Sequence, residues 1–115
     1  MEIKNLNDSI AFSQTTLTKR IVFDTPKVLC FVLNLTPGQS IPDHRHENSA
    51  LTLTVLKGKG QIRVNGKLAA LALGTIVYVD GQDEFSIPTV EEDLALLVTL
   101  SPNPENRLYS QEIDG

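Results

Sequence analysis

Short apolar runs, several of them alternating with polar residues, dominate the chain. In residues 51–56, leucine and valine alternate with threonine, which is the period-two pattern of a half-buried strand. The run at residues 68–73 has a helical composition, but it is short and closed in by turn residues, so we interpret it as a strand and a connection. Other β-type apolar runs predict strands at residues 28–33, 61–64, 75–79, 85–87 and 94–100. The pattern therefore predicts an all-β fold.

Turn residues separate these runs. Asn65 and Gly66 lie between two alternating runs, where a tight hairpin needs two residues that accept a positive φ. Gly58 and Gly60 are expected to end the strand that begins at residue 51, and Pro88 is expected to end the strand that begins at residue 85. Turn signals at this spacing indicate a sandwich or a barrel.

Length and composition favour one folded domain. Of the 115 residues, 41% are hydrophobic and 21% are charged, which is a globular balance. We expect a single domain over residues 1–115, with the barrel core at about 28–100 and a loosely packed C-terminal tail at 102–115. No stretch has the roughly 18 apolar residues that suggest a membrane span, so no membrane partner is expected.

The N-terminus and the cysteine content bear on the compartment. The first ten residues mix charged and polar side chains without an apolar core, unlike a signal peptide. The single cysteine, Cys30, cannot form an internal disulfide and lies in an apolar run, so we expect a buried, inert thiol. Together these features favour the cytoplasm.

Charge is unevenly distributed on a chain whose net charge is −4. Residues 68–106 contain no Lys or Arg, whereas residues 57–67 contain basic residues and no acid. One short basic hairpin on an acidic chain is typical of a solvated edge and not of a nucleic-acid interface. The alternative for this hairpin is docking of an anionic ligand or an acidic partner surface.

Both histidines of the chain, His44 and His46, lie two residues apart. On a strand this spacing places both imidazoles on the same face, where they can share a metal ion. The pair is a weak signal by itself, because two partly exposed loop histidines would have the same spacing.

The residues around this pair resemble the first signature of the cupin superfamily. The matching positions, in order, are Gly38, His44, His46, Leu51 and Gly58. A second signature starts at Gly74 and includes Phe85. The resemblance covers roughly residues 28–100 and implies a double-stranded β-helix, the jelly-roll barrel of mostly antiparallel strands. It also implies a homodimer, since small single-domain cupins are commonly homodimers.

The metal ligands implied by this resemblance are only half present. The family typically holds its metal with three histidines and one glutamate. Here His44 and His46 match two of these ligands, while Leu51 stands at the glutamate position and Phe85 at the third histidine position. Two protein ligands are too few to hold Fe, Mn, Ni or Zn firmly. The candidate third ligand is Asp83, which shares the strand parity of Phe85, and its alternative role is that of a solvated turn residue.

Alternation along the strands outlines a pocket if the two histidines face inward. The expected pocket residues are His44, His46, Leu51, Leu53, Val55, Phe85 and Ile87. Residues 28–35 are apolar on both faces, so we expect one face to meet the core and the other to meet a second sheet or subunit.

Three functions are compatible with these residues. The first is binding of a small organic ligand in an apolar pocket anchored by the histidine pair, with metal absent or weakly held. The second is an enzyme, either a metal-dependent one resembling cupin dioxygenases or isomerases, or a metal-free one with a histidine as acid or base. The third is a regulatory or oligomer-forming protein with a vestigial pocket.

Overall fold

The two longest strands, β4 (Ala50–Val64) and β7 (Phe85–Ser101), pair with each other along most of their length. The computed structural model describes residues 1–114. The remaining strands are β1 (Thr18–Asp24), β2 (Leu29–Leu35), β3 (Ile41–His44), β5 (Lys67–Leu71) and β6 (Ile76–Val79). Two short 3-10 helices, η1 (Leu6–Ser9) and η2 (Arg107–Ser110), lie before and after the strands.

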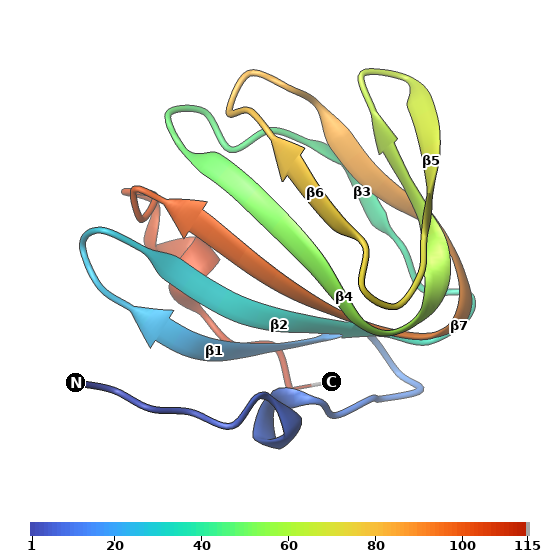
Figure 1. Cartoon of the computed structure of the whole chain (residues 1–115), viewed down its shortest axis with the longest axis horizontal. Coiled ribbons are helices and arrows are strands. Elements are labelled where there is room, and N and C mark those ends of the chain that lie inside the picture. Colours follow the sequence, from blue (N-terminus) through green and yellow to red (C-terminus); the bar gives the residue numbers. More distant parts are fainter. Residues whose placement is uncertain (115) are drawn as a thin grey trace.

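Strands β4 and β7 each pass from one layer of the barrel to the other (Figure 1). The first half of β4 pairs with the second half of β7 in a layer ordered β6-β4-β7-β2-β1. The other halves pair in a layer ordered β5-β4-β7-β3. All of these pairings are antiparallel. The all-β jelly-roll barrel expected from the sequence is therefore confirmed.

The expected strand breaks at Gly58, Gly60 and Pro88 are wrong. Strand β4 continues through both glycines, and the predicted strands at 85–87 and 94–100 are parts of the single strand β7. Gly58 has a φ of 88° and lies where the register between β4 and β7 shifts, and a Cβ there would clash with the carbonyl of Asp93. The glycine thus bends the strand at a bulge without ending it. Pro88 lies at another of these shifts, where the ladder does not need its missing N–H.

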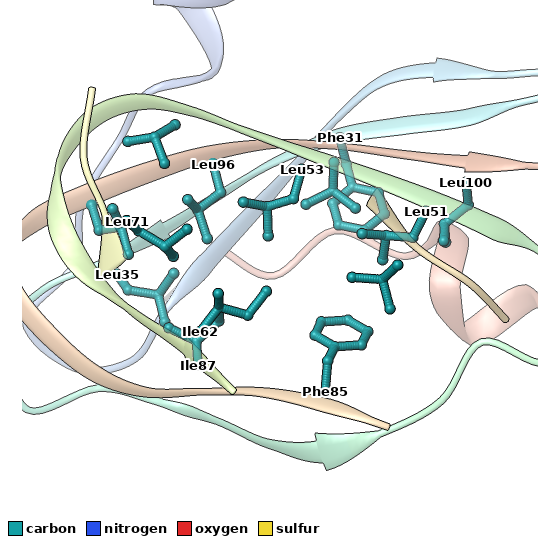
Figure 2. Packing of buried hydrophobic residues seen from close by; sticks show 14 of the residues in the cluster. Phe31, Leu35, Leu51, Leu53, Ile62, Leu71, Phe85, Ile87, Leu96 and Leu100 are labelled. Carbon is teal, nitrogen blue, oxygen red and sulfur yellow. The ribbon is translucent and has the colours of Figure 1, made fainter. Parts of the chain in front are cut away.

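Large aliphatic side chains from both layers pack together in the barrel interior. Figure 2 shows them pointing toward one another, with Phe85 facing Leu51 and Phe31 at one end of the cluster. Burial of each such side chain stabilises the fold by roughly 1.5–3 kcal/mol. Within residues 1–114, no helix is long and apolar enough to cross a membrane.

The second apolar face of β2 meets the N-terminal segment of the same chain. On this face Cys30 and Val32 belong to a separate buried cluster with residues of β1 and β7. Three side chains from the N-terminal segment pack against it, namely Leu6, Ile10 and Phe12. Cys30 is a buried free thiol. A homodimer stays a prediction, which sedimentation at micromolar concentration would test.

The C-terminal segment, which we expected to be a loosely packed tail, forms specific hydrogen bonds with strand β1. Ile113 exchanges two backbone hydrogen bonds with Lys19, of 2.9 and 3.1 Å. The Glu112 carboxylate accepts a 2.8 Å hydrogen bond from the backbone N–H of Ile21. Strand β1 lies at the edge of its layer, so its outer N–H and C=O groups need partners. The segment therefore lies against the barrel wall.

Candidate functional site

An apolar cavity of about 220 Å³ lies inside the barrel. Six of the seven expected pocket residues line it, namely His44, His46, Leu51, Leu53, Phe85 and Ile87. Val55 does not line it, although it is only 2% exposed. Alternation along β4 correctly places Val55 in the interior, but the strand carries it beyond the cavity into the packed core.

Strand β3 and the turn after it bring the two histidines together. His44 is the last residue of β3 and pairs with Phe85 on β7, which brings these two ring centroids to 4.2 Å. His46 follows two residues later, and its ring lies edge-on to that of His44 with centroids 4.9 Å apart. Both rings line the cavity, so the His-x-His spacing produces a polar patch on an otherwise apolar wall.

The two imidazoles differ in their hydrogen bonds. His44 Nδ1 lies 2.9 Å from the carbonyl oxygen of Pro42. A carbonyl only accepts, so Nδ1 carries the hydrogen and the lone pair of neutral His44 is on Nε2. His46 is 8% exposed, and its buried Nδ1 has no hydrogen-bond partner. Burial, and then the charges of His44 and Lys19, lower the pKa of His46 to about 4. His46 is therefore neutral at pH 7.

Two residues of the candidate site, Lys19 and Tyr109, were not identified from the sequence. Both line the cavity, and the Lys19 Nζ donates a hydrogen bond to the Tyr109 carbonyl oxygen. Strand β1, which carries Lys19, was not among the predicted strands. The alternating positions Leu17, Lys19 and Ile21 could have indicated this strand, because Leu17 and Ile21 pack against the core. The lysine at the middle position, where an apolar residue is expected, obscured the pattern. Tyr109 lies on η2 and gave no signal in the sequence.

A wider groove lies outside this cavity. Its volume is about 1080 Å³, and its lining includes Arg45, Asn103 and Arg107. His46 and Tyr109 line both spaces, with ring centroids 4.7 Å apart. These two rings therefore form part of the wall between the apolar cavity and the polar groove.

The donor set does not fit a firmly held metal ion. The carboxylate of Asp83 accepts hydrogen bonds from the Asn65 side chain at 2.9 Å and from the backbone N–H of Asp80 at 3.1 Å. These hydrogen bonds fit the alternative role of Asp83 as a turn residue, and Asp83 does not line the cavity with the two histidines. Within residues 1–114, no cluster of three or more His, Cys, Asp or Glu residues could hold a metal. Leu51 and Phe85 occupy the wall beside the histidines and offer no lone pair.

The strands form one continuous sheet that folds into the two layers of a jelly-roll barrel. The cavity gives this barrel an internal site. The family model of the cupin domain matches residues 31–100, which is more than half of the chain. The chain therefore belongs to the cupin family. A comparison with curated proteins gives no match.

Solved structures agree with this assignment. The TT1209 protein from Thermus thermophilus is 28% identical, with a TM-score of 0.83 over 90% of this chain and 100% of that one. An RmlC-like cupin from Desulfovibrio desulfuricans is 22% identical, with a TM-score of 0.79 over 89% and 97% of the two chains. KdgF from Halomonas sp. is 17% identical, with a TM-score of 0.78 over 92% and 96%. The last two similarities show the fold alone.

Proposed function

We propose that this cupin barrel binds a small organic molecule in its apolar cavity, with His44 and His46 as the polar anchors. The observation that carries the proposal is the replacement of two family ligands by Leu51 and Phe85, whose side chains line the cavity. An apolar site with a few convergent polar groups is the usual form of a small-molecule pocket. The volume of about 220 Å³ suits a compact ligand, because an engineered apolar cavity of about 150 Å³ binds benzene.

Filling the cavity tests this proposal. Leu53 is buried and lines the cavity, whereas its neighbour Thr52 is exposed on the opposite face of β4. Leu53→Phe should abolish binding of benzyl alcohol, followed by NMR chemical-shift changes, and the matched control Thr52→Phe should bind it as the unchanged protein does. Failure of the unchanged protein to bind benzyl alcohol, or equal binding by Leu53→Phe, would contradict the proposal.

Metal analysis separates ligand binding from a metal-dependent activity. Protein purified without a histidine tag is expected to carry much less than one equivalent of Fe, Mn, Ni or Zn, since two histidines are a weak donor set. His44→Ala serves as the matched variant. One equivalent of metal in the unchanged protein that is lost in His44→Ala would favour the metalloenzyme.

A further inference from the structure

The strongest unexplained feature of the cavity is the buried amine of Lys19. The residue is 7% exposed, and Nζ lies 4.4 Å from the centroid of the Phe31 ring. An ammonium group has three hydrogens to donate, and Nζ has one hydrogen-bond partner among residues 1–114, the carbonyl oxygen of Tyr109. A buried lysine normally has a paired charge. The cavity thus contains a cation with unused donors.

No acidic side chain balances this charge. Among residues 1–114, the residues that line the cavity include no Asp or Glu, and Lys19 forms no salt bridge. Burial lowers the pKa of the Lys19 ammonium, and its charge in turn lowers the pKa of His46. The positive potential of Lys19 therefore extends to the histidine side of the cavity.

A second buried polar atom, on a residue that lines the cavity, lacks a partner. His46 is more than nine-tenths buried, and Nδ1 has no hydrogen-bond partner. A neutral imidazole donates from whichever nitrogen carries its hydrogen. With Nδ1 protonated, His46 adds one unpaired donor to a residue that lines the same cavity as Lys19. A cation and a buried donor on an apolar wall match a carboxylate attached to an apolar body.

On the basis of the proposed function, we propose that the ligand is a small carboxylic acid whose carboxylate pairs with Lys19 and His46 and whose apolar body contacts Leu51, Leu53 and Phe85. The cavity volume of about 220 Å³ suits a body of about the size of a benzene ring together with its carboxylate. This assignment names the chemical class of the ligand and makes Lys19 the residue that selects it.

Three probes with the same ring and different head groups test the assignment on the unchanged protein. Benzoate, benzyl alcohol and benzylamine are titrated at neutral pH, with binding followed by NMR or calorimetry. Benzoate is expected to bind at least about tenfold more tightly than benzyl alcohol, because hydrogen bonds to charged groups contribute more than neutral ones. Benzylamine should bind most weakly, since its charge repels that of Lys19.

Two lysine variants then test whether Lys19 causes the preference for benzoate. Lys19→Met keeps an unbranched apolar stem and should remove the preference for benzoate, while benzyl alcohol binds as before. Lys27→Met makes the same change of net charge at an exposed position and should keep the preference. The head-group series on the unchanged protein remains decisive if Lys19→Met does not fold.

The outcomes distinguish the two proposals. If benzyl alcohol or benzylamine binds as tightly as benzoate, the carboxylate assignment is wrong while ligand binding in the cavity stands. If none of the three probes binds, both proposals fail. A preference for benzoate that survives in a folded Lys19→Met protein would also overturn the role of Lys19.

Discussion

Mild acid is predicted to destabilise the fold through His46. The pKa of this imidazole is about 4 in the folded chain, against an ordinary value of 6.5. As the pH falls below 6.5, the unfolded chain binds a proton at His46 and the folded chain does not. The unfolded state therefore holds more protons between pH 6.5 and about 4, and the free energy of unfolding decreases as the pH falls through this window.

The size of the effect follows from the two pKa values. Their difference, 6.5 minus about 4, is about 2.5 pKa units and corresponds to about 3.4 kcal/mol. His46 also lines the outer groove, so water near the ring screens part of this interaction, and we expect about 2 kcal/mol. This is a large share of the roughly 5–15 kcal/mol that stabilises a typical domain.

Urea denaturation of the unchanged protein and of His46→Phe, at about pH 7 and about pH 4.5, measures this contribution. Phenylalanine does not titrate, and its ring can keep the contacts with Tyr109 and Phe85. Carboxylates titrate in both proteins, so the difference between their pH dependences reports His46. The unchanged protein should lose about 1.5–2 kcal/mol more than the variant. Equal losses, or an NMR titration of His46 centred near its ordinary pKa, would refute the reasoning.

Two further predictions concern the bulge and the missing ligands. Gly58→Ala should lower the free energy of unfolding, measured by urea denaturation, by at least about 3 kcal/mol, because its Cβ meets the Asp93 carbonyl. The control Gly66→Ala is also at positive φ but has open space around it, and it should lower this free energy by about 1–2 kcal/mol. Similar losses in the two variants would argue against the bulge. The double variant Leu51→Glu with Phe85→His should gain about one equivalent of nickel by metal analysis, and a folded variant without metal would show that these positions do not correspond to the family's ligands.

The barrel could be predicted from the sequence because its strands carry local signals. Period-two alternation in residues 51–56 and the Asn65–Gly66 turn both depend only on neighbouring residues. The lengths of β4 and β7 could not be predicted in this way. A glycine that bends a strand at a bulge and a glycine that ends a strand look alike in one sequence, and only the pairing partner, here Asp93 opposite Gly58, distinguishes them.

The candidate site also has a part that the sequence predicts and a part that it does not. His44 and His46 are separated by one residue, and this spacing brings both rings to one face if the segment is extended. Strand β3 ends at His44, and the rings still meet. The contact of Lys19 with Tyr109 joins residues that are 90 positions apart, and no periodic pattern relates them. It depends on the C-terminal segment pairing with the exposed edge of β1, which the composition of that segment does not indicate.

The residues found only in the structure change the electrostatic character of the site. A divalent cation beside His44 and His46 would be repelled by the positive charge of Lys19, which already lowers the pKa of His46. Among residues 1–114, no carboxylate lines the cavity to offset this charge. Two changes therefore act in the same direction, because Leu51 and Phe85 remove ligands and Lys19 adds repulsion. The same charge would attract an anion into the cavity. We therefore expect this one arrangement both to weaken metal binding and to favour a carboxylate. If so, Lys19→Met should weaken the preference for the acid and ease metal binding to the histidines together.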